Sequence, residues 1–176
     1  RMFNEKNIRG DSHTNSLKNI SVHPVATGAW RAPGNNSTTF ARESHIDVTA
    51  HKIGINPLEF RLNNLNNQDM SNTLKLAAQT FDWNKPKKEG HGYGIALGED
   101  AGTCVAIIAE VFVDKNTGEV QPIRVVCAQD MGQVVNPHGA TVQTEGGITM
   151  GLGYALFEEV EFNGGNVKTR SFKNYE

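Results

Sequence analysis

Apolar residues first recur at helical spacing after a long polar stretch. Residues 1–36 are polar and rich in turn formers, which predicts mostly loop with short extended pieces. From Ser37 to Ile53 the apolar side chains return every three or four residues, as on one face of a helix. Ser37 is the expected N-cap of this helix, and Gly54 is its expected C-terminal stop.

Two more helices are predicted before residue 90. Asn56-Pro57-Leu58-Glu59 joins a capping side chain to a proline suited to a first turn, which predicts a helix from there to residue 65. The asparagines within 63–67 are expected to end it, and a third helix is predicted over 71–81. The polar, basic stretch 82–92 is the expected boundary between a helical segment, 1–90, and an α+β part, 91–176.

The apolar pattern then changes to a period of two. Residues 103–114 and 119–128 are predicted strands, joined by a turn over 114–118. The first strand is apolar on both faces, so it is expected to be covered on both sides. This hairpin brings Cys104 near Cys127, either as two buried thiols or, in an oxidising compartment, as a disulfide.

A long helix and a second hairpin complete the pattern. Asn136-Pro137 repeats the cap-plus-proline start and predicts a helix over 137–160. Strands over 158–162 and 166–172 follow, with a turn at 163–165. The predicted class is α+β, with a helical N-terminal half and then antiparallel hairpins packed against a long glycine-rich helix.

Composition narrows the classes of function. The chain has 176 residues, 38% hydrophobic and 20% charged, which predicts a globular domain. A net charge of −2 without a basic block argues against nucleic acid as a partner. No apolar run reaches the roughly 18 residues of a membrane helix. Neither the two cysteines nor the six histidines have metal-site spacing, so no metal ligand is assigned.

Four glycines fall within QTEGGITMGLG, residues 143–153. On a helix, Gly146 and Gly147 lie on the same side as Gln143, and several such glycines together cost about 3–4 kcal/mol relative to alanine. Close approach of another group should offset this cost. That group is either a packed element in a notch of small residues or a flat polar ligand bound by the Gln143 amide. A phosphate-binding loop is a third interpretation.

A second unusual stretch is GAWRAPG, residues 28–34, where a tryptophan and an arginine are adjacent in a glycine-flanked loop. Arg31 is either a surface residue beside a core Trp30 or a cation directed at an anionic or oxo group. A third stretch, Asp130-Met131-Gly132, is typical of turn and cap chemistry. The charged residues expected on helix surfaces or at caps are Asp47, Glu59 and Arg61.

These stretches together resemble one family. In order, GAWRAPG, ARESHIDVTAHKIGINPLEFRLNNL and CAQDMGQVVNPHGATVQTEGGITMGLGYALFEE are similar to the molybdenum-binding subunit of the xanthine dehydrogenase/aldehyde oxidase family, of the isoquinoline 1-oxidoreductase β-subunit type. The resemblance implies a molybdopterin cofactor, in its cytosine dinucleotide form, with a Mo=O, Mo=S centre. It also implies hydroxylation of a small aldehyde or N-heterocycle with oxygen from water, and electron transfer to a [2Fe-2S] partner subunit.

The resemblance extends to individual residues. The family's Phe-Arg-Gly-Phe-Gly loop matches residues 30–34, where Arg31 keeps the arginine and Pro33 replaces an aromatic residue that packs on substrate in many members. The family's Gln-x-Glu-Gly helix matches Gln143, Glu145 and Gly146. The expected cofactor-binding residues are therefore Trp30, Arg31, Ala32, Gln143, Gly146 and Gly147.

Two further parts of the family pattern are absent from these residues. The catalytic glutamate of its Gly-x-Gly-Glu segment would lie beyond Glu176, and the upstream glycine–glutamine cofactor loop is also absent. No catalytic residue is assigned here. The chain is expected to be a C-terminal portion of a larger subunit, in either the cytoplasm or the periplasm, and to hold no cofactor by itself. A non-catalytic scaffold and a nucleotide-binding enzyme are the alternatives.

Overall fold

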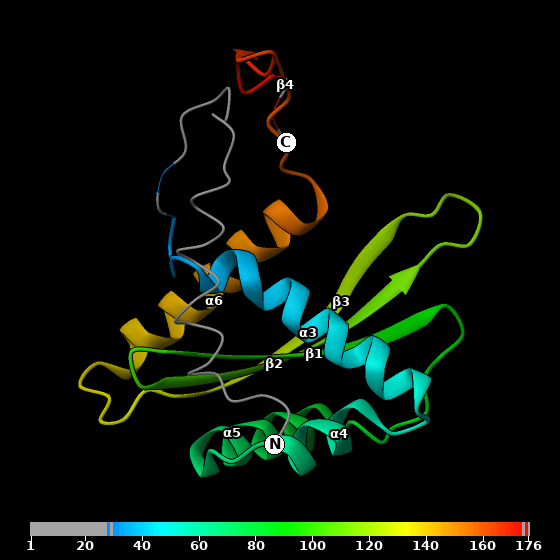
Figure 1. The fold of residues 1–176 in the computed structure, drawn as a ribbon, viewed down its shortest axis with the longest axis vertical. Coiled ribbons are helices and arrows are strands. Elements are labelled where there is room, and N and C mark those ends of the chain that lie inside the picture. Colours follow the sequence, from blue (N-terminus) through cyan, green and yellow to red (C-terminus); the bar gives the residue numbers. More distant parts are fainter. Residues whose placement is uncertain (1–27, 29, 174, 176) are drawn as a thin grey trace. The chain divides into compact units, whose positions relative to one another are not determined.

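The computed structural model describes Gly28, residues 30–173 and Tyr175 (Figure 1). They form two compact units, one over residues 30–135 and one over residues 136–176 with residue 28. Most of the loop predicted over 1–36 lies outside the described residues. The domain division predicted near residue 90 stays a prediction.

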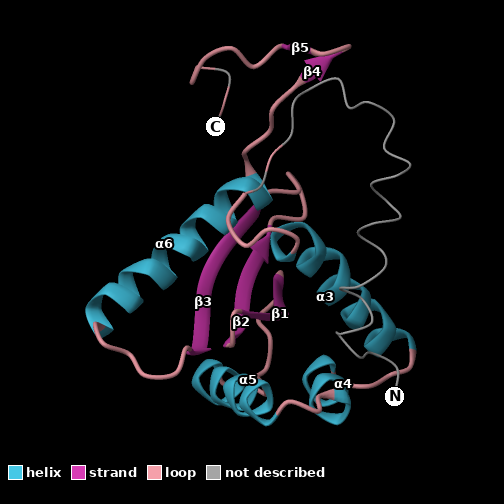
Figure 2. Ribbon diagram, turned by 60° about the vertical axis from the view of Figure 1, so that its left-hand side comes forward, coloured by secondary structure: helices cyan, strands magenta, loops and turns pink. Residues whose placement is uncertain are grey.

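The first unit is a three-stranded antiparallel sheet with helices packed on it. Helices α4 and α5 lie together beside the sheet, and α3 runs along β1 (Figure 2). The strand order is β1-β2-β3. In chain order the elements are α3 (Asn35–Lys52), α4 (Pro57–Asn64), α5 (Gln68–Phe81), β1 (His91–Asp100), β2 (Thr103–Val113) and β3 (Val120–Asp130).

Helix α3 begins three residues before the predicted start. Ser37 is not its N-cap, because Gly34 occupies that position with φ +82°. The Ser37 hydroxyl instead donates to the Gly34 carbonyl at 3.2 Å, inside the first turn. Glycine reaches this left-handed conformation at little cost, so the backbone can turn sharply into the helix without a capping side chain.

The predicted stop at Gly54 is confirmed. Gly54 has φ +71°, and its N–H donates to the His51 carbonyl at 3.1 Å. The next N–H, from Ile55, donates to the Ala50 carbonyl at 3.0 Å. These two bonds form a Schellman motif, which satisfies the last carbonyls of the helix and reverses the chain toward α4.

Asparagine caps define the next two helices. Asn56 caps α4 as predicted, and its side chain accepts a bond from the Leu58 N–H at 2.9 Å. Helix α5 begins at Gln68, three residues before the predicted start. Asn67 does not unravel the chain but caps α5, because its side-chain oxygen accepts from two N–H groups of the first turn.

Strand β1 was not predicted. It pairs along its whole length with β2, from His91 opposite Phe112 to Asp100 opposite Thr103. Glycines at positions 92, 94 and 98 weaken its apolar alternation, and glycine is depleted in strands. Pairing with β2 and the packing of α3 therefore impose an extended conformation that the local sequence does not favour.

The register of β2 and β3 separates the two cysteines. Cys104 pairs with Asp130 and Cys127 pairs with Ile107, so the predicted pairing of the cysteines is wrong by three positions. Part of the slip comes from a bulge that leaves Ile123 unpaired on β3. Because Cys104 and Ile107 are an odd number of residues apart, the two thiols lie on opposite faces of the sheet and form no disulfide.

The core of the first unit lies between α5 and one face of the sheet. Leu74 of α5 and Ile108 of β2 are its largest fully buried side chains. On β2 the buried face is that of Ile108, whereas Val105 and Ile107 on the opposite face are half-buried. The expected covering of both faces is thus complete on one face only. The other buried apolar residues of this core are Met70, Ala77, Ala78, Phe81, Ile95, Leu97, Cys104, Ala106 and Ala128.

The second unit contains α6 (Pro137–Leu156), β4 (Phe162–Asn163) and β5 (Asn166–Val167). Helix α6 begins as predicted, with the Asn136 side chain accepting from the Gly139 N–H, and it ends four residues earlier than expected. The second hairpin turns at Gly164 and Gly165 as predicted, but each strand has only two residues. The α+β class is confirmed. No helix among the described residues is long and apolar enough to cross a membrane.

Candidate functional site

The Arg31 loop, residues 30–34, leads directly into α3. Its Trp30, Arg31 and Ala32 are all exposed, and Trp30 is not a core residue because 61% of it is accessible. Ala32 has φ +51°, a left-handed conformation that costs a non-glycine residue about 1–2 kcal/mol. Strain of this kind is tolerated where the surroundings fix the backbone, and it gathers at ligand-binding segments.

Hydrogen bonds fasten the C-terminal half of this loop to the first turn of α3. The Ala32 carbonyl accepts from the Asn36 N–H at 2.9 Å. The Gly34 carbonyl accepts from the Thr38 N–H at 2.9 Å and from the Thr38 hydroxyl at 2.7 Å. Arg31 makes no hydrogen bond or ion pair with any other described residue.

The glycine-rich stretch lies entirely inside α6, as the helical interpretation predicts. Helix α6 starts six residues before Gln143, so the glycines do not precede a helix N-terminus as in a phosphate-binding loop. Gln143, Gly146 and Gly147 are all exposed, and α6 has no buried residue. The 3.6-residue period of the helix keeps these three residues on one side.

Nearby atoms leave no room for a Cβ at some of the α6 glycines but not at others. A Cβ at Gly139 would lie 2.9 Å from the Asn136 side-chain nitrogen, and a Cβ at Gly153 would collide with the Glu158 carboxylate. At Gly146 and Gly147 no described atom lies within 4 Å of the added carbon. The described residues therefore give no reason for glycine at these two positions, which leaves a bare backbone surface around the Gln143 amide.

The structure describes the two groups of predicted site residues in separate units. The Arg31 loop belongs to residues 30–135, and Gln143, Gly146 and Gly147 belong to residues 136–176. The segment between them has the turn chemistry that was predicted. The Gly132 N–H donates to the Asp130 carboxylate at 3.1 Å, and Asp130 and Asn136 thus serve the local backbone.

A buried polar network is the main feature that the sequence prediction missed. Arg61 was expected on a helix surface or at a cap, but only 3% of it is exposed. Its guanidinium donates to the Glu43 carboxylate at 3.1 Å and to the Asp47 carboxylate at 2.6 Å. The sequence carries one signal of this burial, because Arg61 lies three positions after Leu58 and four before Leu65, which both pack against the core.

The same network is complete in its hydrogen bonds. Arg61 also donates to three backbone carbonyls, those of Pro57 at 3.2 Å, Glu43 at 3.2 Å and Ile95 at 3.0 Å. With the two carboxylate bonds, these contacts use all five guanidinium donors. No buried side-chain nitrogen or oxygen among the described residues lacks a partner. Because hydrogen bonds are strong in a low-dielectric interior, the fully bonded Arg61 guanidinium holds its partners in one arrangement.

No group of three or more histidine, cysteine, aspartate or glutamate side chains in the described ranges could hold a metal ion. The profile of one family, described as a molybdopterin cofactor-binding domain, matches residues 34–176. The chain belongs to the molybdopterin cofactor-binding domain family.

Curated relatives of this molybdopterin cofactor-binding domain are components of oxidoreductases. The β-subunit of isoquinoline 1-oxidoreductase from Brevundimonas diminuta is 32% identical over 150 residues, which cover 82% of this chain and 19% of the relative. A nicotinate dehydrogenase subunit of Pseudomonas putida is 29% identical over 170 residues, covering 86% and 14%. An aldehyde oxidoreductase molybdenum-binding subunit of Escherichia coli K12 is 29% identical over 157 residues, covering 82% and 21%. The chain thus spans about a fifth or less of their lengths.

The residues of this molybdopterin-binding domain fit a pterin on chemical grounds. A pterin edge presents both hydrogen-bond donors and acceptors, and the exposed amide of Gln143 offers both. The bare backbone at Gly146 and Gly147 leaves space for a flat ring system to lie against α6. In the other unit, Arg31 offers a guanidinium that bonds no other described residue, a group suited to an oxo or phosphate group.

Proposed function

We propose that the chain forms one wall of the cofactor site in a molybdenum-dependent oxidoreductase that hydroxylates an aldehyde or an N-heterocycle with oxygen from water. The observation that carries the proposal is the exposed Gln143 amide beside two glycines, at which an added Cβ would meet no other side chain or element among the described residues. Family membership supports the choice of molybdopterin as the ligand. Bound molybdopterin, in its cytosine dinucleotide form, would supply the two-electron redox chemistry.

In this proposal the chain binds and orients, and it does not transfer protons. Gln143 hydrogen-bonds the cofactor edge, and the backbone of Gly146 and Gly147 permits close approach. Trp30, Arg31 and Ala32, in the other unit, are separate candidates for cofactor contact, where the guanidinium would stabilise negative charge on an oxo or phosphate group. The helical rigidity of α6 keeps the Gln143 amide in a fixed orientation, which favours one binding pose of the ligand.

The proposal includes partners. Relatives named as subunits of larger enzymes support assembly with further polypeptide and with a [2Fe-2S] subunit that accepts the electrons. Because α6 has no buried residue, its cofactor face needs other polypeptide to exclude water. We therefore propose that the 176 residues alone hold no molybdenum and turn over no substrate. One molybdenum per purified chain, measured by plasma mass spectrometry, would overturn this part.

Substitution of Gln143 tests the main proposal. In the complete molybdenum-containing protein, Gln143→Leu removes the amide and keeps the side-chain size, so molybdenum per protein and turnover should both fall. Gln79→Leu is the matched control, because Gln79 is also an exposed glutamine on a helix, α5, outside the proposed wall. Unchanged molybdenum content and unchanged turnover in Gln143→Leu would refute the role of Gln143.

A further inference from the structure

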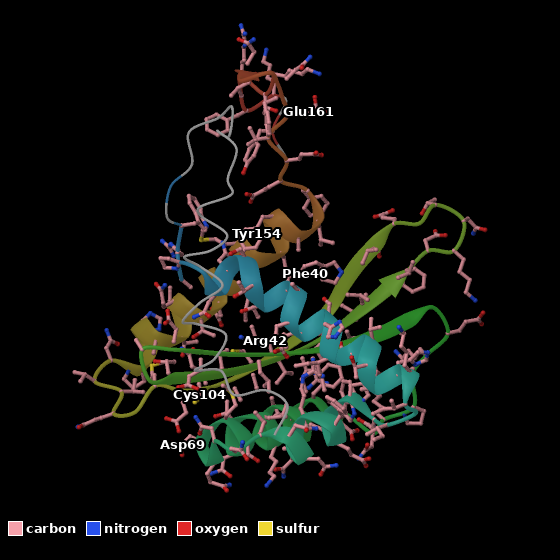
Figure 3. All side chains as sticks on the ribbon, in the orientation of Figure 1. Phe40, Arg42, Asp69, Cys104, Tyr154 and Glu161 are labelled. Atoms are coloured by element: carbon pink, nitrogen blue, oxygen red, sulfur yellow. The ribbon has the colours of Figure 1, made fainter. Side chains whose placement is uncertain are left out.

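The backbone groups at the outer edge of β1 form hydrogen bonds with side chains and not with another described strand. Among the described strands the sheet ends at β1, so the outer backbone groups of β1 have no described strand partner. The Leu97 N–H donates to the Glu43 carboxylate at 3.1 Å, and the Leu97 carbonyl accepts from Arg42 at 2.8 Å. Two successive side chains of α3 thereby reproduce both bonds that a neighbouring strand would make with one residue. Arg42 reaches β1 from the middle of α3 (Figure 3).

Two more contacts extend this pattern along β1. The Ile95 carbonyl accepts from Arg61 of α4 at 3.0 Å. Near the C-terminal end of the strand, the Glu99 carbonyl accepts from the Asn35 side-chain nitrogen at 3.2 Å. We call the four side chains that contact the backbone of β1 the edge ladder; they are Asn35, Arg42, Glu43 and Arg61.

The edge ladder fixes the direction of α3 as well as its position. Glu43 is held between Arg42 at 3.0 Å and Arg61 at 3.1 Å, so its carboxylate cannot move without breaking two ion pairs. Asn35 lies eight residues earlier, about 12 Å along the helix axis. Two anchors at that separation prevent α3 from sliding along β1 and from pivoting about Glu43.

We propose that the edge ladder positions the Arg31 loop, with Asn35 as its terminal positioning residue. Asn35 is the first residue of α3 and directly follows the loop, whose Ala32 and Gly34 carbonyls are bonded to the first helical turn. A displacement of this turn therefore moves the loop with it. The inference deepens the proposed function, because it assigns the cofactor-facing placement of Arg31 to residues that do not touch the ligand.

Fluorine NMR of the full chain tests the positioning without any cofactor. The chain has two tryptophans, Trp30 in the loop and Trp83 beside the core, so 5-fluorotryptophan labelling gives one resonance for each. In Asn35→Ala, the Trp30 resonance should narrow and shift toward that of the unfolded chain. The Trp83 resonance should stay in place, which shows that the fold is intact.

Two further variants separate positioning from general destabilisation. Asn35→Asp keeps the shape and favours the helix N-terminus, but it presents an acceptor to the Glu99 carbonyl, so it should affect Trp30 as Asn35→Ala does. Asn64→Ala is the matched control, since it removes an exposed side-chain bond to the Phe60 carbonyl within α4. It should leave both resonances unchanged.

The outcomes distinguish this inference from the proposed function. If Trp30 is unchanged in both Asn35 variants, the positioning role is refuted whatever the loop binds. If Trp30 changes, molybdenum content is measured in the complete protein carrying Asn35→Asp, where a lower content supports both proposals. A changed Trp30 resonance with full molybdenum content supports positioning by Asn35 and refutes the loop as a cofactor contact.

Discussion

Replacement of Arg61 by methionine should destabilise the first unit strongly. Methionine fills much of the same volume but donates no hydrogen bond. It leaves the Ile95 carbonyl without its donor and deprives the buried Glu43 carboxylate of one of its two cations. Removing one partner of a buried ion pair costs about 3–5 kcal/mol. Against a total stability of about 5–15 kcal/mol, this is a large fraction.

The partners of Arg61 should differ in how much they contribute. The Asp47 side chain is 37% exposed, so water replaces its partner, and Asp47→Asn should cost no more than about 1 kcal/mol. Glu43 is only 6% exposed at its side chain. Neutralising it by Glu43→Gln in the Arg61→Met background removes a buried charge that has already lost one of its two cations, so the double variant should lose less stability than the sum of the two single changes.

Urea unfolding followed by circular dichroism measures these differences. The slope with urea should be the same in all variants, so that the midpoint reports stability. A loss below about 1 kcal/mol for Arg61→Met would contradict the burial argument. Additivity of Glu43→Gln and Arg61→Met within about 0.5 kcal/mol would show that the two residues are not coupled.

Two other predictions concern the sheet. Ala101 has φ +48° in the two-residue turn between β1 and β2, so Ala101→Asn should raise the free energy of unfolding by about 0.5–1 kcal/mol, measured by urea titration; a loss would contradict the turn assignment. Burial raises the pKa of the Cys127 thiol, so its alkylation by iodoacetamide should be slow near pH 8 and accelerate at higher pH, whereas buried Cys104 should react only in urea. Because the raised pKa favours the neutral thiol in the folded state, the stability that the neutral Cys127 thiol contributes is fully present below its unfolded pKa. This stability is lost as pH rises through the folded pKa. Alkylation of Cys127 at a rate independent of pH would contradict the raised pKa.

Local signals were sufficient where the chain itself supplies the hydrogen bonds. Asn56-Pro57 and Asn136-Pro137 start helices as predicted, because the capping oxygen and the N–H groups it serves lie within three residues of each other. Gly54 ends α3 for the same reason. The start of α3 was misplaced because Gly34 turns the backbone by its own conformational freedom, without the side-chain acceptor that the prediction required.

Features that depend on distant residues were missed. Strand β1 is extended because β2 pairs with it and the edge ladder satisfies its outer side, and neither partner can be read from its glycine-interrupted sequence. The burial of Arg61 depends on its bonds to Glu43, 18 residues away in the sequence, and to the Ile95 carbonyl, 34 residues away. The cysteine register failed in part because one bulged residue on β3 shifts every pairing beyond it by one position.

Gly147→Ala distinguishes the two interpretations of α6 that the sequence left open. No described atom lies within 4 Å of the added carbon, so in the 176-residue chain this change should stabilise α6 by up to about 1 kcal/mol through helix propensity. If the face is a ligand wall, the complete protein should keep its melting temperature without cofactor and lose molybdenum content. If the face is a packing notch for other polypeptide, the melting temperature without cofactor should fall instead. Unchanged molybdenum content with a lower melting temperature would therefore refute the cofactor wall, because both explanations use the same bare backbone and differ only in what approaches it.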